Sequence, residues 1–321
     1  MTDCDPAAVE VRPAATVLLV RDTANGTRLG DGNRQLGVRE PGDGTRQLGD
    51  GTRQLGVGIS EPGISQPGVS EPGIEVFMLK RTQRAAFAGG MYVFPGGRVD
   101  DIDGGAEMEA ICDGLTDVRA SELLQIRSGG LAFWVAAIRE CFEEAGVLLA
   151  RSVADGGVVR FDDDHVANRF TVARELVHDS SLGLVGLCTR EGLRLTTDAL
   201  WYIAHWITPL GENRRFDTRF FLARSPIAQE PLHDNGETVA SLWVRPADAI
   251  ARFEAGELMM LPPTVACLEF LAPHRTTDAA IAAAATIGVP PRILPKIRPG
   301  AVPGDPLDLL MPGDPGYDDL P

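Results

Sequence analysis

The residues best suited to chemistry lie in one short segment, residues 132–149, which reads AFWVAAIRECFEEAGVLL. At about 100° per residue, a helix over this segment places Glu140, Glu143 and Glu144 within an arc of about 100°. The opposite side is apolar and includes Trp134. The spacing therefore predicts a helix with one core-facing side and one side that carries carboxylates.

Carboxylates at positions i, i+3 and i+4 repel one another and destabilise a helix by about a few tenths of a kcal/mol per pair. A divalent cation removes this repulsion, and an oxygen-only set of ligands favours Mg²⁺ or Mn²⁺ over zinc. Glu140, Glu143 and Glu144 are thus candidate metal ligands. Taken alone, their spacing is more typical of a solvated acidic face, so the interpretation depends on the neighbouring sequence.

That neighbouring sequence contains a second motif, FPGG at residues 94–97, upstream of R-E-C-F-E-E-A-G-V. In this order the two strings resemble the two halves of the Nudix box. The chain is similar to the Nudix hydrolase family from residue 14 to about residue 271, apart from an internal repeat segment. The resemblance implies hydrolysis of a diphosphate linked to another moiety, with Mg²⁺ or Mn²⁺ held by Glu140, Glu143 and Glu144. It also implies an α+β fold, an α/β/α sandwich in which helices flank a mixed sheet.

The box departs from the family pattern in its length. Gly97 and Arg139 are 42 positions apart here, against about fourteen in the family, which leaves an insertion over roughly residues 103–130. The amphipathic string SELLQI within it predicts a small helical flap. The position where the family has a glutamate six residues after the glycine is Asp103, which we expect to position Arg139 or a neighbouring water.

The resemblance also suggests roles for individual residues of the box. Arg139 is expected to orient the carboxylates by ion pairing rather than to touch substrate. The general base varies within the family, so Glu144, Glu140 and Glu237 all stay open as catalytic candidates. Glu237 lies in a loop-like HDNGE segment before a predicted strand.

The segment before the box resembles one branch of the family, the coenzyme A diphosphatases. It reads LKRTQRAAFAGGMYVFPGG and supplies Arg81 and Arg84, although Arg84 is displaced from the family spacing. We expect one of these arginines to contact a substrate phosphate, such as the 3′-phosphate of coenzyme A. Gly96 and Gly97 are expected to let substrate approach the backbone, because glycine has no Cβ.

Downstream strings also resemble this branch, namely RRFDTRFF at residues 214–221 and LPPT at residues 261–264. The leading substrate is therefore coenzyme A or an acyl-CoA, with ADP-ribose and NADH-type compounds as alternatives. A different class of function is a non-catalytic Nudix-like nucleotide sensor. Such sensors usually lose box carboxylates and gain a DNA-binding domain, whereas this chain keeps the three glutamates and shows no basic helix-turn-helix.

The elements that must position these residues can be predicted from apolar runs and their periodicity. We expect strands at residues 14–20, 74–80, 200–208, 216–223 and 239–244, and further helices at residues 166–178, 246–255 and 263–271. The domain organisation that follows is a first strand in residues 1–24, a repeat insertion in 25–73, a Nudix domain in 74–275, and an Ala/Pro-rich C-terminal extension in 276–321. The extension is expected to be extended and partly docked.

The insertion at residues 25–73 holds 13 of the 36 glycines, with recurring GTRQLG and GISEP-like units. Glycine is costly to order and proline cannot join a strand ladder, so we predict a disordered loop. Such an insertion between paired strands costs little, because loop closure depends only logarithmically on length.

Composition limits the partners of the chain. A net charge of −15, from 30 basic and 45 acidic residues, argues against general nucleic-acid binding. We expect no membrane span and a cytoplasmic setting, since no apolar run approaches about 18 residues and the five cysteines form no CxxC pair. The expected partner is a small nucleoside diphosphate derivative, and the oligomeric state stays open, with a homodimer as one alternative.

Overall fold

The computed structural model describes residues 9–23, 72–85, 87–234, 236–298, 300 and 308–320. The repeat segment predicted over residues 25–73 falls outside the described residues apart from its last two positions. Within the described ranges, no helix is long and apolar enough to cross a membrane.

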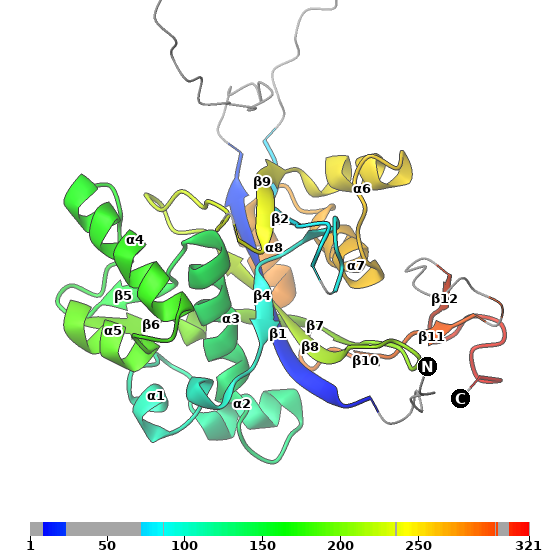
Figure 1. Cartoon of the computed structure of the whole chain (residues 1–321), viewed down its shortest axis with the longest axis horizontal. Coiled ribbons are helices and arrows are strands. Elements are labelled where there is room, and N and C mark those ends of the chain that lie inside the picture. The colour runs from blue at the N-terminus through cyan, green and yellow to red at the C-terminus, as the bar shows by residue number, and fades with distance from the viewer. Residues whose placement is uncertain are drawn as a thin grey trace, which may run out of the picture. The chain divides into compact units, whose positions relative to one another are not determined.

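A mixed sheet forms the centre of the domain (Figure 1). Its strands are β1 (Val11–Asp22), β2 (Ile74–Arg81), β3 (Tyr92–Val93), β4 (Gly96–Arg98), β7 (Trp201–Ile207), β8 (Arg215–Arg224), β9 (Thr238–Val244) and β10 (Arg292–Ile293). They follow the order β10-β7-β8-β1-β2-β3, while β4 pairs with β1 and β9 pairs with β2. The pairing of β1 is parallel with β8 and antiparallel with β2 and β4. The prediction of a mixed sheet is confirmed.

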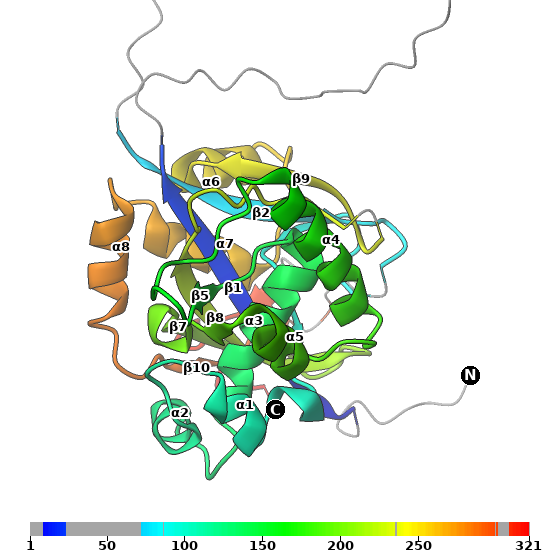
Figure 2. The same ribbon diagram turned by 90° about the vertical axis from the view of Figure 1, so that its left-hand side faces the viewer.

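Helices cover both faces of this sheet (Figures 1 and 2). They are α1 (Ala106–Ala110), α2 (Asp117–Leu124), α3 (Leu131–Ala145), α4 (Asp164–His178), α5 (Leu184–Glu191), α6 (Pro246–Glu254), α7 (Pro262–Leu271) and α8 (Thr277–Ala284). Successive residues of β1 point to opposite layers. Val17 and Leu19 pack in the core with α3, α4 and α5, whereas Leu18 and Val20 pack in the core with α7 and α8.

Shorter elements complete the domain. They are β5 (Ala150–Ser152), β6 (Leu193–Leu195), β11 (Lys296–Ile297), β12 (Leu309–Leu310) and two 3₁₀ turns, η2 (Asp101–Asp103) and η3 (Thr197–Ala199). β5 pairs with β6, and β11 pairs with β12, each antiparallel.

The predicted strands and helices are all present, with small shifts at their ends. The helix α3 ends at Ala145 rather than at residue 149, because Gly146 adopts a left-handed φ of 69° and so ends the helix with a glycine cap. The short helices α5 and α8 were not predicted. The C-terminal extension is therefore less extended than expected, because α8 packs on β7, β8 and β1 and β10 joins the sheet.

The insertion in the box is a packed part of the domain and not a flap. Asp117, at the start of α2, accepts the backbone N–H of Leu131 at 3.0 Å, and Ser121 Oγ accepts that of Gly130 at 2.9 Å. Ala120 is fully buried. The insertion thus binds backbone N–H groups at the N-terminus of α3 that have no partner within the helix.

The strands β1 and β2 remain paired up to the point where the repeat segment begins and ends. Asp22 lies opposite Ile74 in the register. One residue further, the Thr23 N–H donates to the Gly73 carbonyl at 2.8 Å, and the Gly73 N–H donates to Thr23 Oγ1 at 3.0 Å. The two ends of the inserted segment are therefore held side by side by the sheet.

Candidate active site

The helix α3 is buried along nearly its whole length, including most of its carboxylate side. The side chains of Glu140, Glu143 and Glu144 retain only 14%, 12% and 9% of their exposure. The solvated acidic face that the spacing would suggest when taken alone is therefore not what the structure shows. The strand β4 and the turn η2 pack against this side of the helix. Helical periodicity alone cannot predict this packing.

Arg139 links the two halves of the box. Its guanidinium donates to both carboxylate oxygens of Asp103, at 2.7 and 2.9 Å, and to the carbonyl of Arg98 at 2.9 Å. It also donates to Glu140 at 2.8 Å and to Glu143 at 3.2 Å. Burial acts to lower the pKa of Arg139, but the hydrogen bond to Asp103 and the adjacent glutamates outweigh it and raise the pKa above its usual range.

Asp103 thus takes the position expected from the motif, although the inserted residues separate it from Arg139 in sequence. The 3₁₀ turn η2 presents this carboxylate, which is fully buried. A bidentate carboxylate–guanidinium pair fixes the guanidinium plane as well as its position. Arg139 is thereby held where it contacts Glu140 and Glu143.

The two glycines of FPGG allow β4 to pass close to α3 and β1. A Cβ on Gly97 would lie 2.5 Å from the carboxylate carbon of Glu140, and one on Gly96 would lie 2.5 Å from Thr16 Oγ1. The Gly96 N–H donates to Glu144 Oε2 at 2.9 Å. In this structure, the space left by the glycines accommodates protein groups, and the Gly96 amide binds Glu144.

Burial makes the carboxylates of α3 difficult to ionise. Burial and the charge of Glu140 raise the pKa of Glu144 to about 8, against the opposing effects of the Gly96 N–H and Arg81. Burial likewise raises the pKa of Glu140 to about 7, although Arg139 opposes it. The pKa of Glu143 is also raised by burial. The site therefore gives these carboxylates too little solvation for easy ionisation, and the adjacent arginines offset this only in part.

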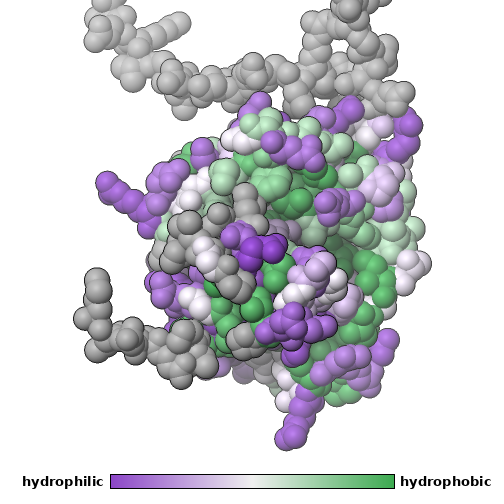
Figure 3. All heavy atoms as spheres, turned by 90° about the vertical axis from the view of Figure 1, so that its right-hand side faces the viewer, coloured by the Kyte–Doolittle hydropathy of each residue, from purple (hydrophilic) through white to green (hydrophobic). Residues whose placement is uncertain are grey.

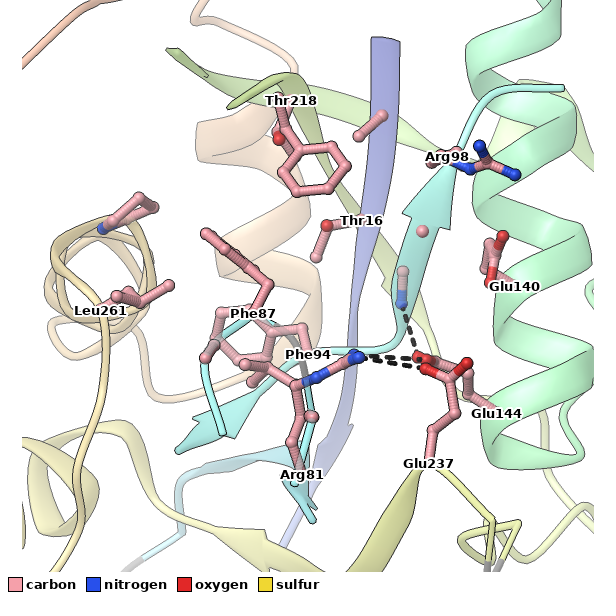
Figure 4. Close-up of a pocket in the computed structure, with 18 of the residues that line it drawn as sticks. Thr16, Arg81, Phe87, Phe94, Arg98, Glu140, Glu144, Thr218, Glu237 and Leu261 are labelled. Atoms are coloured by element: carbon pink, nitrogen blue, oxygen red, sulfur yellow. Dashed lines mark hydrogen bonds and ion pairs between the residues drawn. The ribbon is translucent and has the colours of Figure 1, made fainter. Parts of the chain in front are cut away.

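Arg81 reaches the same site from the end of β2 (Figure 4). Its guanidinium donates to Glu237 Oε2 at 3.0 Å and lies 3.8 Å from Glu144 Oε1. The Glu237 side chain is 60% exposed. Arg81, one of the two arginines expected to contact a substrate phosphate, is thus already paired with two carboxylates. The alternative, Arg84, is exposed and does not line the adjacent cavity.

The carboxylates face a cavity of about 880 Å³, which lies at the upper end of the usual range for ligand sites. Figure 4 shows Glu140, Glu144 and Arg98 on one side of it, and Phe87 and Leu261 on the other. Figure 3, viewed from the side of the C-terminal extension, shows apolar side chains around a hollow on that face.

The far side of the cavity contains residues to which the sequence reasoning gave no role. Phe216 and Leu261 belong to the RRFDTRFF and LPPT strings, and both line the cavity. Those strings were the available signal. Pro295 and Leu309, from the C-terminal extension, also line it, and no motif marked them.

A buried Arg–Asp pair, three carboxylates on one helix, and the FPGG strand against that helix together reproduce the arrangement implied by the box. The family model described as the NUDT19 Nudix domain matches residues 116–271. Over these residues, the chain is similar to the Nudix hydrolase family. It is also similar to members of the coenzyme A diphosphatase branch.

Two curated relatives show this similarity. The acyl-coenzyme A diphosphatase NUDT19 of Gallus gallus is 33% identical over 226 residues, a match that covers 59% of this chain and 58% of the relative. The Homo sapiens protein of the same name is 29% identical over 221 residues, with the same shares of the two chains. The chain thus spans less than two thirds of the length of these relatives.

A similar solved structure supports the assignment of the fold, and of the fold only. A Nudix hydrolase from Alicyclobacillus acidocaldarius superposes with a TM-score of 0.56 at 24% identity. The alignment covers 88% of this chain and the whole of that one. The mixed sheet with flanking helices is therefore shared with a known Nudix hydrolase.

Proposed function

We propose that this protein is a metal-dependent diphosphatase that hydrolyses coenzyme A or an acyl-CoA to 3′,5′-ADP and a 4′-phosphopantetheine. The observation that supports this most directly is the set of buried carboxylates on α3 beside a large cavity. The names of the curated relatives support the choice of substrate. The activity and the substrate are both proposals for this chain.

The residues fit a hard divalent cation by their chemistry. Glu140, Glu143 and Glu144 offer oxygen ligands, which suit Mg²⁺ or Mn²⁺. A bound cation would favour their ionised form, against the burial that raises the pKa values of Glu140 and Glu144. Among the described residues, no group of three or more His, Cys, Asp or Glu side chains is already arranged to hold a metal ion. Glu140 and Glu143 each contact Arg139 through Oε1 alone, so their second carboxylate oxygens could bind a cation, whereas Glu144 would exchange its contact with Gly96 or Arg81 for one with the cation.

When bound, a divalent cation would offset the charge of the diphosphate oxygens and make a water molecule more acidic. The chain's own groups would do the remaining work. Arg139 would keep Glu140 and Glu143 oriented, because its buried pair with Asp103 holds the guanidinium in place. Glu144, Glu140 and Glu237 remain the candidates for the base that accepts a proton from the attacking water.

The substrate can be tested with purified full-length protein against coenzyme A, ADP-ribose, NADH and dinucleoside polyphosphates, each with Mg²⁺ and with Mn²⁺. We expect coenzyme A or an acyl-CoA to be cleaved most efficiently. Better cleavage of ADP-ribose or NADH would redirect the substrate assignment to those compounds. No cleavage of any diphosphate by folded protein would favour the nucleotide-sensor alternative.

The carboxylates can be tested separately from the substrate. Glu143→Gln and Glu144→Gln should each reduce turnover by at least about 100-fold, because each removes a ligand charge from the site. Glu175→Gln is the matched control, since Glu175 is exposed on α4 and does not border the cavity. Near-normal turnover of either site variant with Mg²⁺ would contradict the assignment of metal ligands.

A further inference from the structure

The cavity has two halves with different chemistry, here called the carboxylate half and the apolar half. The carboxylate half contains the glutamates of α3, Arg81, Arg98 and Arg139. The apolar half is lined by Phe87, Phe216, Leu261, Pro295 and Leu309, which come from distant parts of the chain. The two halves are continuous, so one elongated molecule can contact both.

The apolar half is completed by the C-terminal extension, which lies beyond the residues that match the family model. β10 adds to the edge of the sheet in parallel with β7, in register with His205 and Trp206. Pro295 lies two residues after the end of this strand and borders the cavity. Leu309 faces the same cavity from β12, whose pairing with Ile297 fixes its position.

Aromatic contact and small polar groups define the shape of this half. The rings of Phe87 and Phe216 pack edge to face, with centroids 5.2 Å apart. They therefore form one apolar surface, and a planar ligand group cannot stack between them. Thr16 and Thr218, from β1 and β8, place hydroxyl-bearing side chains along the sheet side of the cavity (Figure 4). This half therefore suits an apolar ligand that carries a few neutral hydrogen-bonding groups.

Charge separates the two ends of a coenzyme A thioester. The nucleoside end carries a 3′-phosphate, whereas the acyl-pantetheine arm is uncharged and contains amides, a thioester and an alkyl chain. Burial of an unpaired phosphate would be costly. Arg81 and Arg139 are paired with glutamates in this structure, so Arg98, whose side chain is 54% exposed, is the more accessible arginine of the carboxylate half. Arg214 also borders the cavity, from the exposed turn before β8, where Glu212 accompanies it.

We propose that the apolar half, closed by Pro295 and Leu309, binds the uncharged acyl-pantetheine arm while the diphosphate lies over the carboxylates of α3. This inference rests on the proposed function and adds to it the orientation of the substrate. It makes the C-terminal extension a determinant of specificity. A longer acyl chain should bind more tightly because it buries more apolar surface against this wall.

The test uses full-length protein with a charged residue placed in the apolar half. Leu309→Asp changes the C-terminal extension, and Phe87→Asp changes the loop between β2 and β3. Because the two substitutions lie in separate segments, the same effect from both cannot come from local misfolding of one segment. Val289→Asp is the matched control. It makes the same type of change in the same extension, at a residue that is 42% exposed and outside the cavity lining.

The first measurement compares KM for octanoyl-CoA and for coenzyme A. In the unaltered protein we expect KM for octanoyl-CoA to be lower by on the order of tenfold. Leu309→Asp and Phe87→Asp should remove this difference, whereas Val289→Asp should keep it. Equal KM values for the two substrates in the unaltered protein would overturn the proposal.

The second measurement is independent of catalysis. Calorimetry with S-octanoyl-pantetheine, which lacks phosphate and adenosine, should detect binding to the metal-free protein. Both cavity variants should weaken this binding by on the order of tenfold, and Val289→Asp should not. The proposal would be overturned if S-octanoyl-pantetheine did not bind. It would also be overturned if the cavity variants weakened the binding of 3′,5′-ADP instead, because the apolar half would then bind another part of the substrate. Absence of coenzyme A hydrolysis would contradict the proposed function alone, because this binding experiment requires no turnover.

Discussion

Replacement of Glu144 by glutamine should stabilise the metal-free protein at alkaline pH while it impairs the site. The pKa of Glu144 is raised to about 8 from its ordinary value of 4.5, chiefly by burial and by the charge of Glu140. The folded protein therefore binds a proton that the unfolded chain releases at about pH 4.5. The stability from this proton is fully present below that pH and is lost as the pH rises through about 8.

The size of the effect follows from the same shift. A folded pKa of about 8 against 4.5 corresponds to a loss of at most roughly 5 kcal/mol between acidic and alkaline pH. Glutamine stays neutral and retains an oxygen that can accept the Gly96 N–H. Its amide group gains nothing from Arg81, so we expect a net stabilisation of about 1–3 kcal/mol above pH 8. This corresponds to a rise in Tm of roughly 2–10 °C.

Thermal unfolding in EDTA from pH 5 to pH 9 measures this directly. Relative to the unaltered protein, Glu144→Gln should show a flatter dependence of Tm on pH, with the largest gain at pH 9 and little gain at pH 5. Glu175→Gln should follow the unaltered protein throughout. Addition of Mg²⁺ at pH 8 should raise Tm for the unaltered protein more than for Glu144→Gln. A Tm difference that is constant with pH would refute the view that Glu144 is a buried, largely protonated acid.

Three further perturbations test other parts of the molecule. Asp103→Asn should lower the free energy of unfolding by about 3–5 kcal/mol in denaturant titrations, because it leaves buried Arg139 with a weakened pair; an unchanged midpoint would contradict this. Gly97→Ala should preserve the fold by circular dichroism but weaken Mg²⁺ binding in calorimetry, since its methyl group would displace the Glu140 carboxylate 2.5 Å away. Deletion of residues 26–72 with a short Gly-Ser turn should leave turnover within a few-fold and Tm nearly unchanged, because the flanking strands are already paired; loss of folding would show that the segment is needed.

Part of the site could be predicted from local sequence because its pattern is local. Glu140, Glu143 and Glu144 lie at positions i, i+3 and i+4, so periodicity alone places them on one side of α3. The strands β1 and β2 are recognisable from short runs of apolar and β-branched residues. The mixed sheet and the site helix were therefore predictable without any knowledge of contacts.

The contacts of that helix required the tertiary structure, because their partners are distant in sequence. The strand β4 buries the carboxylate side through Gly96 and Gly97, and this burial raises the pKa values of the carboxylates. Asp103 reaches Arg139 across an insertion that sequence spacing left ambiguous. In both cases, a contact between elements that are distant in sequence determines the ionisation or the position of a site residue.

The sequence by itself determined the resemblance to the Nudix hydrolases, the candidate metal ligands and the main elements of the fold, since each depends on residue type and short-range spacing. Only the tertiary structure decided that Arg81 is held by Glu144 and Glu237 rather than left free for phosphate. It also decided that Pro295 and Leu309 complete the cavity. The physical reason is that burial and ion pairing depend on which segments pack together, and no local period in the sequence records that packing.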